Sequence, residues 1–245
     1  IEVDGEIPDV ILLNNDLTNG VIPGLSGVVE PPVEMGWQNR RKSNHYMYLE
    51  KLVSEVSEIL QIDPWILMPI WKVCEEKCLE FENCKEKLAN DIDELIDKIT
   101  EKYEHYGIKS EPVVFVKNDR GTYGLGIISV RKGDEIKKLS KRKIKRLTYG
   151  KGGTSAENFL IQEGVPTSLI HESSVLEPVG YTIGGKKLFW FFRGNNKKSV
   201  IENLNSPSSK YIQLEHINSE FKDSINFELF ELVSKLSFLA MGEEN

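Results

Sequence analysis

The sequence predicts an α+β protein in which a helical N-terminal part is followed by a mainly antiparallel sheet with flanking helices. Apolar residues recur at helical spacing in the first half of the chain, and short β-branched or aromatic runs between turn residues dominate the second half. Helices first and strands later is the order typical of α+β folds. A chain of 245 residues, 40% of them hydrophobic, can bury a full core.

The first half is expected to hold one short strand and three helical segments. The apolar run DVILL at residues 9–13 precedes turn residues and predicts a strand, whereas the Pro- and Gly-rich residues 22–36 predict an irregular connection. Ser43 or Asn44 is the expected N-cap of the first helix. The helices are expected at 44–60, from Asp63 to Trp71, and at 86–105.

The second half is expected to form the sheet. The segment KLFWFFR is apolar on both faces, which predicts a central strand. Strands are expected at 113–117, 125–130, 158–163, 178–183 and 187–193, and helices at 133–147 and 224–241.

Composition argues against several classes of protein. The formal net charge of −7 argues against a general nucleic-acid binder, and the chain lacks any apolar run near the roughly 20 residues that cross a bilayer. The cysteines are odd in number and fit a reducing, cytoplasmic setting rather than a disulfide framework. A homo-oligomer is compatible with the sequence, which does not fix the oligomeric state.

A lysine and three glycines mark the connection between the first two predicted strands of the sheet. Lys117 ends the strand VVFVK, and Gly121, Gly124 and Gly126 follow it. Glycines let backbone N–H groups approach phosphate oxygens closely, and an ammonium adds a positive charge. The spacing is neither a Walker motif nor a strand–GxGxxG–helix motif, because a strand follows. The segment indicates either a phosphate-binding loop or a long hairpin loop with a surface lysine.

A second polar strand end occurs in NFLIQEGV, residues 158–165. Gln162 and Glu163 end an apolar run and precede a glycine. This pattern indicates either a contact to the edge of a purine ring or a strand end with an exposed charge.

A third polar segment is FFRGNNKKSVIENLNSP, residues 191–207. Arg193 ends an apolar strand, and Glu202, Asn203 and Asn205 follow after a polar loop. Carboxylate and amide oxygens suit Mg²⁺, and an arginine offsets phosphate charge. The alternative is a polar turn, since Asn and Ser are common in turns.

Together the three segments follow the order of an ATP-grasp nucleotide site: a lysine, then Gln-Glu, then an arginine with Glu-x-x-Asn. Wider matches over about residues 9–210 resemble the proteobacterial-type glutamate–cysteine ligase family. The resemblance implies an ATP-grasp fold, in which two α+β lobes hold ATP between them. The matching segments are LLNNDLTNG (12–20), GWQNRRKSNHY (36–46), IDPWILMP (62–69), VKNDRGTYGLGI (116–127), QEGV (162–165), EPV (177–179) and ENLNSP (202–207).

The resemblance implies an ATP- and Mg²⁺-dependent ligase that joins the γ-carboxylate of glutamate to the amine of cysteine through an acyl phosphate, the first step of glutathione biosynthesis. An ATP-grasp ligase for another amino-acid pair and a catalytically silent ATP-grasp interaction protein remain alternatives. Residues 1–43 are then expected to be the remnant of a longer N-terminal region with a connector. Residues 44–110 are expected to form a helical subdomain, and residues 111–245 the nucleotide-binding sheet domain.

The resemblance also implies a role for each motif residue. Lys117 and Arg193 are the expected catalytic residues. The expected nucleotide contacts are Lys117, Gly121, Thr122, Tyr123, Gly124, Gln162, Glu163 and Val165. The expected magnesium ligands are Glu202, Asn203 and Asn205. The amino-acid substrates are expected to bind Asn14, Asn15, Asp16, Arg40, Arg41 and Lys42. For the three cationic residues, the alternative is a solvated charge run before a helix.

Overall fold

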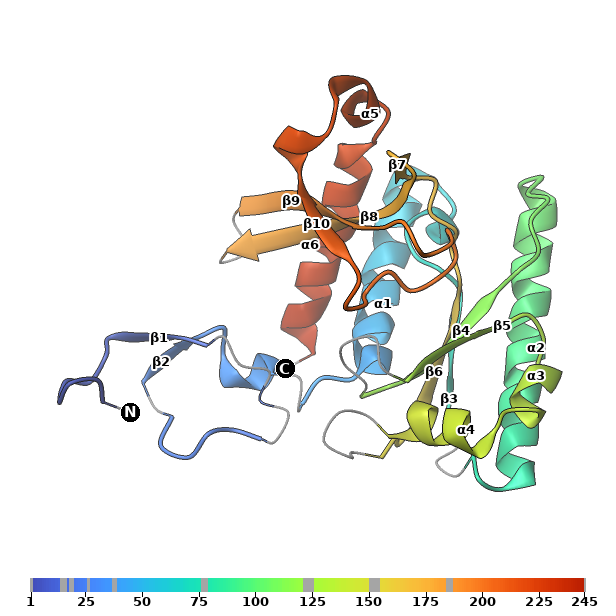
Figure 1. Cartoon of the computed structure of the whole chain (residues 1–245), viewed down its shortest axis with the longest axis horizontal. Coiled ribbons are helices and arrows are strands. Elements are labelled where there is room, and N and C mark those ends of the chain that lie inside the picture. Colours follow the sequence, from blue (N-terminus) through green and yellow to red (C-terminus); the bar gives the residue numbers. More distant parts are fainter. Residues whose placement is uncertain are drawn as a thin grey trace.

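The computed structural model describes residues 2–13, 17, 20–25, 27–36, 39–75, 79–120, 126–149, 155–183 and 187–244 (Figure 1). Among these residues it is a mixed α+β structure with two four-stranded antiparallel sheets and a parallel pair of short strands. The antiparallel architecture expected from the sequence is present, but it is divided between two sheets. None of the described helices is long and apolar enough to cross a membrane.

The first sheet presents two chemically different faces. Its strands, in spatial order, are β3 (Trp71–Cys74), β6 (Phe159–Glu163), β4 (Val114–Asn118) and β5 (Ile127–Val130). Val116 and Ile161 lie on the face that packs against α2 (Glu82–His105), which runs along this sheet (Figure 1). Side chains alternate along a strand, and directly opposed residues of antiparallel strands share a face. Lys117 and Gln162 therefore lie on the other face.

The second sheet is likewise covered on one face. Its strands, in spatial order, are β10 (Lys210–Gln213), β9 (Lys187–Asn195), β8 (Ser174–Ile183) and β7 (Ile170–His171). Leu176 and Phe192 pack against α5 (Ser219–Asp223) and the start of α6 (Phe227–Glu243). The interior position of β9 confirms the prediction of a central strand. Phe189 is nevertheless 51% exposed, so this strand is not buried on both faces.

Helices α1 (Lys42–Leu60) and α6 lie side by side and share a third apolar core (Figure 1). Helix α1 begins two residues earlier than expected, and the prediction of Ser43 or Asn44 as its N-cap is wrong. The N-cap is Arg41, whose side chain makes no capping hydrogen bond. Instead, the backbone N–H of Ser43 in the first turn donates to the side chain of Asp119.

Several short elements differ from the sequence prediction. The segment carrying Trp71 was expected to be helical but forms β3, because Pro69 cannot continue a helix and the following apolar residues pair with β6. The single helix expected at 133–147 is split, since Ser140 starts a new helix by accepting from the backbone N–H of Lys143. The remaining elements are β1 (Val10–Leu12), β2 (Val28–Glu30), η1 (Val33–Met35), η2 (Pro64–Ile66), α3 (Asp134–Lys137), α4 (Lys141–Thr148) and η4 (Leu214–His216).

Gly133 marks the close approach of α3 to α2, and it gives a test of the fold. An added Cβ would lie 2.1 Å from the carbonyl oxygen of Ala89, and the Gly133 N–H donates to Asp93 at 2.6 Å. We expect Gly133→Ala to lower the free energy of unfolding by about 1–3 kcal/mol, measured by chemical denaturation. Gly242 in α6 has nothing within 4 Å of an added Cβ, so Gly242→Ala is the matched control and should be neutral or slightly stabilising. Equal stability of Gly133→Ala and the wild type would contradict the packing of α3 on α2.

Candidate functional site

A cavity of about 180 Å³ is lined by residues of both sheets, and we call it the inter-sheet cavity. From the first sheet come Lys117 on β4 and Ile127 on β5; from the second comes Glu177 on β8. The connection after β9 contributes Glu202 and Asn203. Three segments that are far apart in the sequence therefore meet at one cavity.

Lys117 is partly buried and is not the surface lysine of the hairpin alternative. Its Nζ donates to Oε1 of Gln162 at 2.5 Å, and Gln162 is in turn hydrogen-bonded to the hydroxyl of the partly buried Tyr46. Burial lowers the pKa of Lys117 to about 8, and the negative charge of Glu177 offsets part of that effect. The hydrogen-bond partner of this ammonium is thus a neutral amide, while the carboxylate that acts on its pKa belongs to the other sheet.

Glu177 also pairs with Arg193, which lies directly opposite it on β9. The distance from Nη1 of Arg193 to Oε1 of Glu177 is 2.7 Å, and the guanidinium lies 5.9 Å from the ring centre of Tyr211. The Nε of Arg193 is buried and has no hydrogen-bond partner among the described residues. Sequence reasoning missed Glu177 as a site residue. The sequence feature that could have indicated Glu177 is the EPV segment, which contains it. Its pairing with an arginine, however, depends on the register between β8 and β9.

The expected magnesium ligands lie at the cavity only in part. Glu202 accepts from the backbone N–H of Ser199 at 2.8 Å and from Lys198 at 2.9 Å, and these contacts, the first above all, lower the pKa of its carboxyl. Asn203 accepts from the backbone N–H of Asn205 at 3.1 Å. Glu202 and Asn203 line the inter-sheet cavity, whereas Asn205 is exposed and is not among the lining residues.

A second cavity, also of about 180 Å³, lies at the start of α1, and we call it the cationic cavity. It is lined by Arg40, Arg41, Lys42, His45, Tyr46, Asp119 and Arg120. All three cations expected to bind substrate thus line one cavity and are partly buried, and their role in substrate binding stays a prediction. Burial lowers the pKa of Lys42 to about 8, against the attraction of Asp119 and with a further lowering by the charge of Lys117. Gln162 is hydrogen-bonded both to Lys117 of the inter-sheet cavity and to Tyr46 of the cationic cavity, so the two cavities adjoin.

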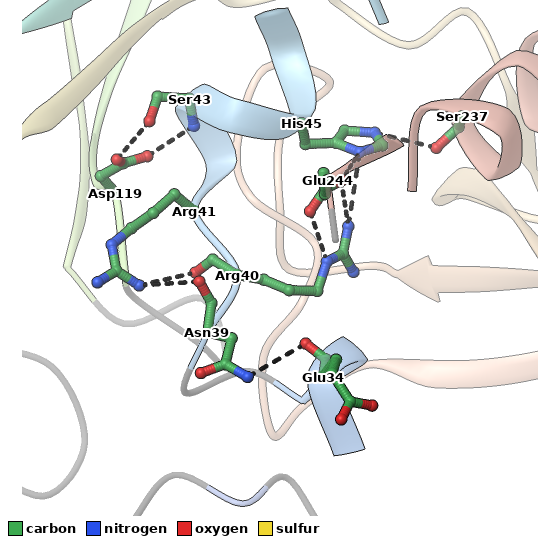
Figure 2. Close-up of polar contacts among 9 residues, drawn as sticks. All are labelled: Glu34, Asn39, Arg40, Arg41, Ser43, His45, Asp119, Ser237 and Glu244. Atoms are coloured by element: carbon green, nitrogen blue, oxygen red, sulfur yellow. Dashed lines mark hydrogen bonds and ion pairs between the residues drawn. The ribbon is translucent and has the colours of Figure 1, made fainter. Parts of the chain in front are cut away.

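The arginines of the cationic cavity are held by specific contacts (Figure 2). Arg40 binds both carboxylate oxygens of Glu244 at 2.9 Å, and Nδ1 of His45 lies 2.5 Å from the same carboxylate. Arg41 donates to the backbone carbonyls of Asn39 and Arg40 at 3.2 and 3.3 Å. Arg40 pairs at 2.9 Å with the buried carboxylate of Glu244, whereas Arg41 lies 3.4 Å from the half-exposed carboxylate of Glu157. Arg41 is therefore the less neutralised of the two arginines and the better placed to attract an anion.

Glu163 is turned away from the inter-sheet cavity. Its carboxylate accepts from Nε1 of Trp65 at 2.7 Å and from the backbone N–H of Ile70 at 3.1 Å, and the residue is 1% exposed. It lies on the face of the first sheet that packs against α2, whereas Gln162 lies on the opposite face and Val165 lines the cavity. This position contradicts the expected purine contact through the carboxylate, and it also excludes the exposed-charge alternative.

Two groups of expected site residues lie outside the described residues. They are the expected substrate contacts Asn14, Asn15 and Asp16, and the expected nucleotide contacts Gly121, Thr122, Tyr123 and Gly124. The roles expected for them stay predictions.

The lowered pKa of Lys117 gives a test that needs no ligand. Its pKa falls from 10.5 to about 8 on folding, so the unfolded chain binds more protons than the folded chain between these values. The free energy of unfolding of the wild type therefore rises with pH across that window. We expect Lys117→Met to be more stable than the wild type at pH 7 by about 1–3 kcal/mol, and this difference to shrink between pH 8 and 10.5.

Urea denaturation across this pH range measures the difference between variant and wild type. Lys235→Met is the matched control, because the side chain of Lys235 is 64% exposed on α6, and its effect should not change with pH. A pH-independent difference for Lys117→Met would contradict the buried position of the ammonium.

Comparison with known proteins identifies the family. The whole chain, residues 1–245, matches the family model GshA: Glutamate-cysteine ligase. A solved structure from Methylobacillus flagellatus KT, named as a candidate gamma-glutamylcysteine synthetase, has a TM-score of 0.84 and 32% identity; the match covers 99% of this chain and 60% of that chain. D-alanyl-alanine synthetase A from Vibrio cholerae O1 matches over 77% of this chain and 45% of its own with a TM-score of 0.32 and 18% identity, too low to support an argument. No curated protein matches. The chain belongs to the glutamate–cysteine ligase family.

Proposed function

We propose that the chain is the ATP-grasp part of a cytoplasmic ligase that uses ATP to join the γ-carboxylate of glutamate to the amine of cysteine. Family membership supports the two amino acids. The chain spans 60% of the length of the Methylobacillus structure, so the activity of the whole protein is part of the proposal. The observation that carries it is the meeting of Lys117, Glu177 and Glu202 at the inter-sheet cavity.

The electrostatics of the inter-sheet cavity favour a polyphosphate. Lys117 holds a charge that burial makes costly, and a phosphate oxygen beside it would relieve that cost. Arg193 does not line this cavity but pairs with Glu177, which does, so it places a second cation next to the lining. Its buried Nε has no hydrogen-bond partner among the described residues. We assign the phosphates of ATP to Lys117 and Arg193, with backbone N–H groups of residues 121–124 as further donors.

The oxygen donors at the same cavity fit Mg²⁺. Glu202, kept ionised by Ser199, lies beside Asn203, and Glu177 offers a second carboxylate. No group of three or more His, Cys, Asp or Glu residues in the described part of the chain could hold a metal by itself. Phosphate oxygens and water usually complete the coordination of Mg²⁺ in nucleotide sites, so a partial protein set is sufficient. A bound ion would offset the charge of the phosphates.

The cationic cavity suits the dicarboxylate glutamate. Arg41 and Lys42 supply positive charge there, and Lys42 adjoins Lys117 of the inter-sheet cavity. The γ-phosphoryl group then moves from ATP to the γ-carboxylate: its bond to the ADP oxygen breaks and a bond to the carboxylate oxygen forms. The amine of cysteine attacks the acyl phosphate, phosphate leaves, and the nitrogen loses a proton. The protein contributes orientation and charge stabilisation to both steps.

A coupled ADP-release assay on the full chain tests this function. We expect ADP release from ATP·Mg²⁺ only when glutamate is present, and stoichiometric dipeptide formation when cysteine is added. Lys117→Met should lower turnover by at least about 100-fold, because it removes a charge that faces the transferring group, whereas Lys235→Met should be unchanged. ATP turnover with a different amino-acid pair would reassign the substrates. Binding of ATP·Mg²⁺ without turnover of any amino acid would support the silent alternative.

The proposed metal site makes a separate prediction. Glu202→Gln removes a negative oxygen donor and should raise the Mg²⁺ concentration needed for half-maximal turnover by about tenfold. Glu215→Gln, at an exposed position of η4, is the control. An unchanged magnesium titration for Glu202→Gln would remove this residue from the metal site.

A further inference from the structure

The N-cap residue of α1 makes no capping hydrogen bond, and the helix start is capped instead by Asp119, the residue that follows β4. Three of the first donors of α1 bind Asp119. The Ser43 N–H donates to Oδ1 at 2.7 Å and the Ser43 hydroxyl to Oδ2 at 2.6 Å (Figure 2). The Lys42 N–H donates to the Asp119 carbonyl at 3.2 Å. Unpaired N–H groups at a helix start need an acceptor, and a carboxylate there also interacts favourably with the helix dipole. Asp119 therefore fixes where α1 begins.

The contact is buried and reinforced. Asp119 is 2% exposed, and its own N–H donates to the carbonyl of Asn158 at 3.2 Å. The ammonium of Lys42 donates back to the carbonyls of Asn118 and Asp119 at 3.0 and 3.2 Å. The start of α1 thus donates several hydrogen bonds to the residues at the end of β4. We treat these two segments as one cross-linked unit.

This unit lies between the two cavities. Asp119 and Lys42 line the cationic cavity, while Lys117, two residues before Asp119, lines the inter-sheet cavity. A shift of the α1 start relative to β4 would change the separation of the two binding sites. Errors of about 1 Å in the relative position of reacting groups can cost on the order of 100-fold in rate.

We propose that Asp119 and Ser43 are positioning residues that hold the cationic cavity in register with Lys117, so that the nucleotide and the carboxylate substrate bind cooperatively. A phosphate bound to Lys117 restricts the motion of the end of β4. Because Asp119 is hydrogen-bonded to Ser43, the cations at the start of α1 are then restricted as well. Such coupling is reciprocal: each ligand raises the affinity for the other by the same factor. This inference rests on the proposed function.

The test compares ligand affinity with turnover in the full chain. The Kd of a non-hydrolysable ATP analogue with Mg²⁺ is measured with and without glutamate, and kcat and KM come from ADP release. In the wild type, glutamate should tighten analogue binding by about 5- to 50-fold. In Ser43→Ala and Asp119→Asn this coupling factor should fall to about 1. The kcat should fall by about 10- to 100-fold in both variants. The Kd for each ligand measured alone should stay within about threefold of the wild-type value. Ser43→Thr keeps the hydroxyl and should restore both values.

Asn226→Ala is the matched control. Asn226 accepts from the backbone N–H of Leu229 at 3.0 Å and caps α6, so the variant loses a helix cap outside both cavities. It should leave the coupling factor unchanged. Amide hydrogen exchange of residues 42–45 without ligands gives a second readout: exchange should become faster in Ser43→Ala and Asp119→Asn but not in Asn226→Ala.

The outcomes separate this inference from the proposed function. Wild-type protein that binds neither ligand would overturn both. Wild-type protein that binds and turns over both substrates with a coupling factor near 1 would overturn only the inference. Normal kcat in Ser43→Ala with loss of activity in Asp119→Asn would mean that Asp119 contacts a substrate directly and is not a positioning residue.

Discussion

The site depends on a positive charge that the fold buries without giving it a carboxylate of its own. Lys117 donates to the neutral side chain of Gln162, and the negative charge that acts on its pKa, that of Glu177, is shared with Arg193 on the other sheet. Burial of an ammonium with so little compensation is unfavourable, as the lowered pKa of Lys117 records. A phosphate group would relieve this cost. In the proposed function, the affinity of this cavity for phosphate would come from the electrostatic cost of burying Lys117 in the ligand-free protein.

A second constraint fixes the start of α1 from two directions (Figure 2). On one side Asp119 caps the first turn and ties it to β4. On the other side Arg40 and His45 hold Glu244 at the end of α6. The segment between these contacts carries the cations of the second cavity. Its position relative to Lys117 is therefore determined by buried polar contacts rather than by loop conformation, which is the arrangement that transfer between two bound substrates requires.

The residue types at strand ends predicted much of this site. The other site residues could not be predicted because their positions depend on contacts between segments that are far apart in the sequence. Lys117, Glu202 and Asn203 meet at one cavity, as a lysine at one strand end and oxygen donors after another suggested. Glu163 was expected at the nucleotide, but a strand alternates its faces and the sequence does not say which face meets the cavity. Glu177 was missed because its partner is opposite it on another strand, and Asp119 because Ser43, the residue it caps, lies 76 residues earlier in the chain. A short apolar run such as the one around Trp71 fits a helix and a strand equally well, so its pairing with β6 could not be predicted.

The most direct test of this account follows the protonation of Lys117 itself. An NMR titration of its side-chain nitrogen, assigned with Lys117→Arg, should give a pKa of about 8 in the ligand-free protein. Addition of ATP·Mg²⁺ should move that pKa upward, because a phosphate beside the ammonium stabilises the charged form. A pKa near the ordinary 10.5, or one that does not respond to ATP·Mg²⁺, would contradict the claim that a partly buried and only partly compensated ammonium forms the phosphate site.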